Sequence, residues 1–211
     1  MFEIDVSAIE PVGEFGSQAW CEACAEYGVK MLEAAFLPEN LEWAFSETYT
    51  HPPARFLEGG RELSGYYFMV KDGRVSGGDG VPDACRALSG FHVQLQWAAI
   101  CNQSGSKYGP AGQRRRSEQE KVMFEEIEAY VGRSNPLGLG GGPKAVWPKE
   151  VVAALSVGMQ DGGGLHNIAA ALQSPSPEFA DLPTTDMGVP LFSSMTEDQK
   201  RFFLELCGVA V

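Results

Sequence analysis

The sequence predicts an α+β fold, with a small, mostly antiparallel sheet packed by a central buried helix and by flanking helices, and with a loop-rich helical C-terminal segment. Two observations lead to this prediction. Residues 41–78 contain short runs in which apolar and polar side chains alternate, as they do in strands with one buried face. The stretches on either side of these runs carry apolar side chains at helical spacing. Helices gathered on an antiparallel sheet bury both patterns at once.

The composition changes at Gly132, which divides the chain into two parts. We expect residues 1–132 to form the α+β core domain. Residues 133–211 begin with a glycine-rich run and hold several prolines further on. Such residues interrupt regular elements, so we expect a glycine- and proline-rich connector followed by a helical segment that packs on the core.

The chain has 28 acidic residues against 16 Lys and Arg residues, which gives a formal net charge of −12. This negative charge disfavours nucleic acids and anionic membranes as partners, because both are bound through Lys and Arg. The first residues do not combine a basic region with an apolar one, so no secretion signal is expected. Five cysteines, an odd number at irregular spacing, are typical of reduced thiols, and we expect a cytoplasmic protein.

Residues 17–36 are predicted to form an amphipathic helix that begins after Ser17, a favourable N-cap residue. The run WCEAC at positions 20–24 resembles the active-site motif of thioredoxins, but Glu22-Ala23 stands where that motif has Gly-Pro. Both of its thiols lie on the apolar stripe of the helix. We therefore expect them to be buried rather than reactive.

Residues 41–51 alternate and are predicted to form a strand. One face of this strand carries Trp43, Phe45, Glu47 and Tyr49, and its aromatic character indicates that it faces the core. Glu47 is therefore expected to point inward. A carboxylate in such a place needs a hydrogen-bond partner or a proton, because burying an unpaired charge costs free energy.

A β-hairpin is predicted next, around the pair Asp72-Gly73. This pair readily supplies the positive φ angles of a two-residue type I′ turn. The alternation then places Tyr66, Phe68 and Val70 together on the apolar face of the hairpin.

Residues 82–102 are predicted to form the central helix, with Pro82 in its first turn. No charged residue follows Arg86 until Lys107, so this helix should be buried on most sides. We expect it to pack across the sheet. One of its helical stripes holds Leu88, His92, Leu95 and Ala99.

Four later helices are expected. A capping box formed by Ser117 and Glu120 predicts a helix over residues 117–131. The basic trio Arg114, Arg115 and Arg116 precedes it; a solvated cluster is favoured for this trio over an anion-docking site. Helical spacing also predicts helices at residues 148–159 and 165–172, and a last helix capped by Thr196 and Gln199.

The candidate site combines two ionisable side chains with a high density of aromatic rings. Glu47 and His92 are the candidate catalytic or polar binding residues, since a helix packed across the sheet would bring them together. The pocket walls are expected to be formed by Trp43, Phe45, Tyr49, Tyr66, Phe68, Leu88 and Leu95. This arrangement is typical of a binding or sensory module for a small, partly apolar or aromatic ligand, with no cofactor.

Other functions stay open. Glu47 could act as a general base oriented by His92 in an enzyme without a nucleotide cofactor, or the two could form a buried hydrogen bond that only stabilises the core. The chain could instead be a protein-interaction subunit, for example in a homodimer. A metal site formed by His51, His92 and a carboxylate is a further alternative, but no spacing requires it and no metal is expected.

Overall fold

The computed structural model describes residues 4–101, 107–139, 146–156 and 164–210. Its centre is a four-stranded sheet in the order β4-β3-β2-β5. The strands are β2 (Trp43–Thr50), β3 (Ser64–Lys71), β4 (Arg74–Asp79) and β5 (Gly90–Gln96). β3 is antiparallel to both β2 and β4, whereas β5 is parallel to β2. Helices pack on this mixed sheet, which confirms the predicted α+β class.

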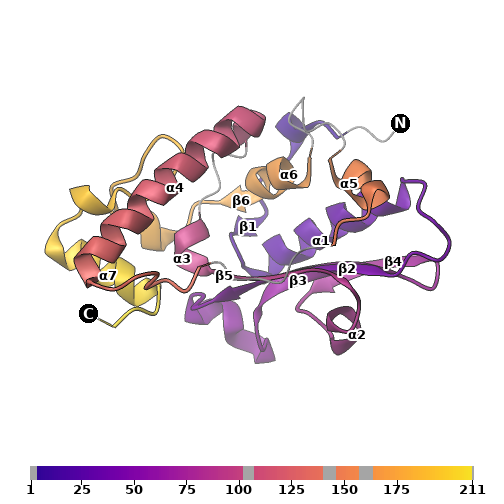
Figure 1. Ribbon diagram of the computed structural model, residues 1–211, viewed down its shortest axis with the longest axis horizontal. Coiled ribbons are helices and arrows are strands. Elements are labelled where there is room, and N and C mark those ends of the chain that lie inside the picture. The colour runs from indigo at the N-terminus through magenta and orange to yellow at the C-terminus, as the bar shows by residue number, and fades with distance from the viewer. Residues whose placement is uncertain (1–3, 102–106, 140–145, 157–163, 211) are drawn as a thin grey trace.

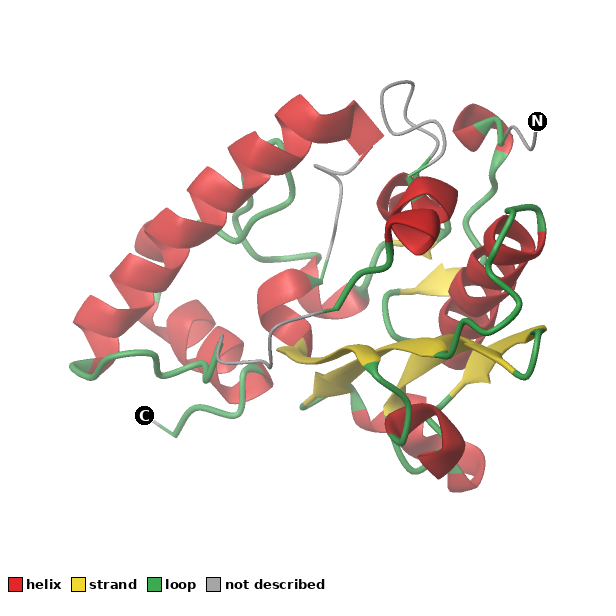
Figure 2. Ribbon diagram, turned by 45° about the vertical axis from the view of Figure 1, so that its right-hand side comes forward, coloured by secondary structure: helices red, strands yellow, loops and turns green. Residues whose placement is uncertain are grey.

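The two faces of the sheet are covered differently (Figure 1). Helix α1 (Gln18–Glu33) lies on one face, which we call the α1 face, and contacts β3 and β4. The short helix α2 (Asp83–Arg86) lies on the opposite face, which we call the α2 face. Figure 2 shows helices α5 and α6, whose bounds follow below, on the same side as α1, with the long helix α4 (Gly109–Val131) standing away from the sheet.

The predicted hairpin is confirmed. Val70 pairs with Val75, and Asp72 and Gly73 have φ angles of 51° and 69°, as a type I′ turn requires. Tyr66, Phe68 and Val70 are all buried on the α1 face. The turn chemistry and the alternation therefore set the strand register together.

Helix α1 also forms as predicted. The Ser17 hydroxyl accepts a hydrogen bond from the backbone N–H of Trp20, which caps the helix. Gly28 lets α1 approach β3, because a Cβ at this position would lie 2.5 Å from the Phe68 ring. Cys21 and Cys24 are fully buried, and desolvation raises the pKa of both thiols, so neither is an activated thiolate.

The predicted central helix is wrong. Residues 83–100 form three elements: α2, the strand β5, and the short helix α3 (Trp97–Ile100). Gly90 allows β5 to pair with β2, because a Cβ there would lie 1.7 Å from the carbonyl oxygen of Ala44. The residues that follow Gly90 alternate between the two faces of the sheet. A helical stripe and a strand alternation both fit this run, and pairing with the distant strand β2 favours the strand.

Helix α4 begins at Gly109, so the capping box predicted at Ser117 does not form. Ser117 instead donates its hydroxyl to the backbone carbonyl of Gln113, inside the helix. The prediction of a solvated basic trio is wrong for one member. Arg114 and Arg115 are exposed, but Arg116 is buried and pairs with Glu120 at 2.9 Å. Its Nη1 also donates to the carbonyl of Met187 at 3.0 Å, which ties α4 to the C-terminal segment.

The chain after Gly132 returns to the body of the molecule. Helices α5 (Lys149–Leu155) and α6 (Leu165–Ala171) contact α1, and β6 (Gln173–Ser174) pairs in parallel with β1 (Gly13–Glu14). The last three residues of the helix predicted at 148–159 lie outside the described residues.

Five further elements complete the description of the fold. The 3₁₀ turn η1 precedes β1, and η2 follows β2. Near the C-terminus, η5 and η6 precede α7, whose predicted capping box at Thr196 and Gln199 is confirmed. Phe203 of α7 is buried, whereas Phe202 is 41% exposed. The bounds of these elements are η1 (Val6–Ala8), η2 (Ala54–Gly60), η5 (Pro177–Phe179), η6 (Phe192–Ser194) and α7 (Glu197–Leu206).

Candidate functional site

A cavity of about 590 Å³ lies between the α1 face of the sheet and helices α4, α5 and α6, and we call it the sheet–helix cavity. Its sheet side and the adjoining helices α1 and α3 contribute Trp20, Phe45, Glu47, Tyr66, Leu95 and Ile100. Helix α4 contributes Gln113, Arg116, Ser117 and Glu120. Residues in and around α5 and α6 complete the lining with Trp147, Val152, Leu155, Ser156, Leu165, His166 and Ala169.

The strands position the floor of this cavity. Phe45 and Glu47 are two residues apart on β2, so both point to the α1 face, and Tyr66 pairs with Glu47 across the ladder. The rings form a continuous wall: Phe45 and Tyr66 have centroids 5.5 Å apart, and Tyr66 meets Trp20 edge-on at 5.8 Å. The exposed residues Ser117, Trp147 and Val152 form the rim.

Glu47 is half-buried at the cavity floor. The Tyr49 hydroxyl donates a hydrogen bond to its Oε1 at 2.6 Å, and among the described residues no other group hydrogen-bonds this carboxylate. Burial raises the pKa of Glu47 to about 7, although the Tyr49 hydrogen bond acts in the opposite direction. The carboxyl group therefore changes its charge near neutral pH.

A second carboxylate lies in the α4 wall. Glu120 pairs with Arg116, which lowers the pKa of Glu120, but burial outweighs the pairing and the net effect is a raised pKa. His166 lies at the start of α6. Its side chain is reached by solvent, yet the surrounding protein still lowers its pKa by desolvation. The imidazole is therefore mostly neutral at pH 7.

His92 lies on the other side of the sheet. Its Nδ1 is 2.8 Å from the Ser46 hydroxyl and its Nε2 is 3.0 Å from the carbonyl oxygen of Leu88. Because a carbonyl only accepts, Nε2 carries the proton and Nδ1 accepts from Ser46. Ser46 and Glu47 are adjacent on β2 and so point to opposite faces. The structure therefore does not bring His92 to Glu47.

The predicted wall residues divide into two groups. Phe45, Tyr66 and Leu95 line the cavity together with Glu47. Trp43, Tyr49 and Phe68 are buried in the core beside it, and Leu88 is not among the lining residues. Sequence reasoning missed Trp147, Arg116, Glu120 and His166, which come from segments far from the sheet in sequence. The sequence signal for Arg116 was its spacing from Glu120. In a helix that begins at Gly109, Arg116 lies one turn before Glu120 and can pair with it.

The described residues do not contain a group of three His, Cys, Asp or Glu side chains that could hold a metal ion. His51 packs against the C-terminal segment, where a Cβ on Gly208 would lie 2.2 Å from its Nε2. His92 is bound to Ser46 on the α2 face. His51 and His92, the two histidines of the alternative metal site, therefore contact different parts of the protein.

Within the part of the chain that the structure describes, no helix has both the length and the apolar character needed to cross a lipid bilayer. Comparison of the chain with protein-family models, with curated proteins and with solved structures gives no match.

Proposed function

We propose that the protein binds a small, partly apolar or aromatic molecule in the sheet–helix cavity. The observation that carries this proposal is the combination of an aromatic-walled cavity with the Glu47 carboxylate at its floor. A volume of about 590 Å³ lies within the range of small-molecule sites, and a few convergent polar groups among apolar walls are their usual form.

An acid–base mechanism through Glu47 and His92 has less support. The two side chains lie on opposite faces of the sheet, and both nitrogens of His92 already have protein partners. Binding requires only the cavity and its lining. A cytoplasmic location is also proposed, and the free, buried thiols of Cys21, Cys24, Cys85 and Cys207 support it.

The binding proposal is tested with uncharged probes: the fluorescent dye Nile red and the aromatic alcohol tryptophol. A molecule that binds only the folded state raises the melting temperature, so tryptophol should raise Tm in a concentration-dependent way. Nile red fluorescence should increase on binding and fall as tryptophol displaces the dye. Absence of both effects would contradict the proposal.

Two variants of α4 locate the binding site. Ser117→Trp places an indole at the cavity rim and should abolish both effects, because it fills the space that the probe needs. Val122→Trp is the matched control, since Val122 is 54% exposed on the same helix and does not line the cavity. Equal binding by the two variants would place the probe elsewhere.

A further inference from the structure

The charged side chains of the sheet–helix cavity are unevenly balanced. Among the described lining residues, Glu47 and Glu120 are acidic and Arg116 is basic. When both carboxyl groups are ionised, two negative charges face one positive charge. His166 adds little positive charge at neutral pH, because desolvation lowers its pKa.

Arg116 is directed toward groups of the protein. Its Nε pairs with Glu120, its Nη1 donates to the carbonyl of Met187, and its Nη2 lies 3.4 Å from the carbonyls of Ile100 and Cys101. A guanidinium held by this set of acceptors is already neutralised by protein groups. It is therefore a poor site for an anionic ligand.

Glu47 presents the opposite situation. Tyr49 binds its Oε1, while Oε2 receives no hydrogen bond from the described residues, and no described cation pairs with the carboxylate. Burying the charged carboxylate without a cation beside it costs free energy. A ligand that brings a positive charge or a hydrogen-bond donor to Glu47 offsets this cost and therefore binds more tightly.

The rings around Glu47 favour the same kind of ligand. Phe45 and Tyr66 lie on neighbouring strands, and the Trp147 ring is 6.3 Å from Phe45 at the rim. The faces of aromatic rings attract cations, and this attraction is strongest in sites that exclude water. The rings also give the apolar skeleton of a ligand a surface to pack on.

We propose that the ligand is an aromatic or apolar amine whose ammonium group binds Oε2 of Glu47 while its skeleton packs on the cavity rings. This inference rests on the binding function proposed above and adds the ligand's charge and contact atom. An acid of the same skeleton would place its carboxylate against Glu47, in a cavity that Glu120 also lines, and like charges repel.

The titratable and charged groups around Glu47 come from several elements. Tyr49, Tyr66 and Cys24 interact with it, Cys21 lies beside the two tyrosines, and Arg116, Glu120 and His166 line the same cavity. The tyrosines and cysteines have raised pKa values and stay neutral between pH 5 and pH 8. Glu47 itself becomes ionised in this interval. Amine binding should therefore strengthen as the pH rises, and binding at pH 7 should release protons from Glu47.

The test uses three probes with one indole skeleton: tryptamine, tryptophol and indole-3-propionic acid. Isothermal titration calorimetry on the full chain at about pH 8 should give tryptamine an affinity about tenfold above that of tryptophol, with the acid weakest.

Glu47→Gln keeps the size of the side chain and its acceptor for Tyr49 but removes the charge. This variant should bind tryptamine no more tightly than it binds tryptophol. Glu118→Gln, on the exposed side of α4, should keep the preference.

Wild-type protein gives an independent readout that does not depend on a variant. Titrations at pH 7 in buffers of different ionisation enthalpy should show proton release with tryptamine and none with tryptophol. If tryptophol binds but tryptamine has no advantage, or if Glu47→Gln keeps that advantage, the amine proposal is overturned and the binding function stands. If none of the probes binds, both proposals are overturned.

Discussion

The Glu47 carboxylate lies at the floor of the sheet–helix cavity with a hydrogen bond from Tyr49, in surroundings that disfavour its charge. The alternation of β2 predicts that Glu47 points inward, and the structure places it so. The same alternation shows why Ser46 points to the α2 face and meets His92 there. For this strand, the face of each side chain follows from the sequence pattern alone.

The raised pKa of Glu47 makes the stability of the protein depend on pH. In the unfolded chain the carboxyl group ionises near pH 4.5, whereas in the folded protein it ionises near a pKa of about 7. Between these values the folded state binds more protons, so stability falls as the pH rises. The loss is complete above about pH 8 and amounts to about 3 kcal/mol at most.

Glu47→Gln removes this titration and leaves the other groups unchanged. Relative to wild type, the variant should gain up to about 3 kcal/mol in the free energy of unfolding between about pH 4.5 and pH 8. Urea unfolding at a series of pH values measures the difference. Parallel pH profiles for the two proteins would show that Glu47 titrates normally in the folded state.

At the scale of elements, β5 shows where local pattern is ambiguous. Leu88, His92 and Leu95 have helical spacing, while Phe91, Val93 and Leu95 alternate as in a strand. The neighbouring strand decides between the two, because β2 offers its backbone groups to β5 along the register from Ala44–Gly90 to Thr50–Gln96.

Gly90→Ala should disrupt this pairing. The added Cβ would meet the backbone of Ala44, which cannot move without displacing β2, so we expect a loss of about 3 kcal/mol or more in the free energy of unfolding. Gly78→Ala is the control in the edge strand β4, where the nearest atom to the new Cβ is 3.7 Å away. Its effect should stay within about 1 kcal/mol. Equal unfolding free energies for the two variants, measured in urea, would contradict the close approach at Gly90.

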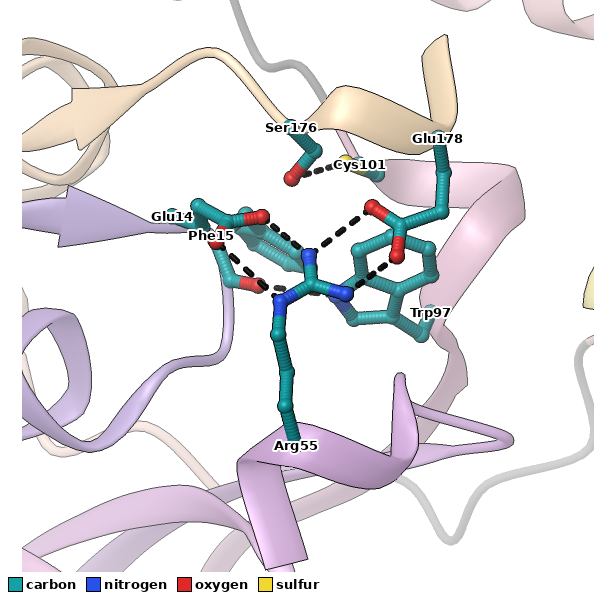
Figure 3. A network of polar contacts seen from close by, with 7 residues as sticks. All are labelled: Glu14, Phe15, Arg55, Trp97, Cys101, Ser176 and Glu178. Carbon is teal, nitrogen blue, oxygen red and sulfur yellow. Dashed lines mark hydrogen bonds and ion pairs between the residues drawn. The ribbon is translucent and has the colours of Figure 1, made fainter.

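At the scale of the whole molecule, segments far apart in sequence are held together by a polar network (Figure 3). Arg55 of η2 lies between Glu14 of β1 and Glu178 of η5 and forms ion pairs with both. Beside it, the Trp97 indole donates to the carbonyl of Phe15 at 2.7 Å. The network joins the N-terminal strand, the end of the sheet and the C-terminal segment.

Arg55→Met should lower the free energy of unfolding by about 1 kcal/mol at neutral pH, a value reduced by solvent screening because the Arg55 side chain is 36% exposed. Arg55 lowers the pKa of Glu178. Its contribution is therefore complete above about pH 4.5 and is lost as the pH falls through the folded pKa of Glu178. The unfolding free energies of wild type and variant should converge in acid and in high salt.

Arg201→Met is the control for this network, because Arg201 forms an exposed ion pair with Asp198 inside α7. It should change the free energy of unfolding by no more than about 0.5 kcal/mol. If Arg55→Met has no larger effect than Arg201→Met, the network does not stabilise the packing of the three segments.

The sequence by itself determined α1, the hairpin, the inward face of β2 and the cap of α7, because capping, turn chemistry and alternation act between residues close together in the chain. Only the tertiary structure decided that residues 90–96 are a strand, that Arg116 is buried against Met187, and that Trp147 and His166 complete the cavity. Each of these depends on contacts between residues far apart in sequence. Such contacts contribute more free energy than local propensity, and a local pattern does not report them.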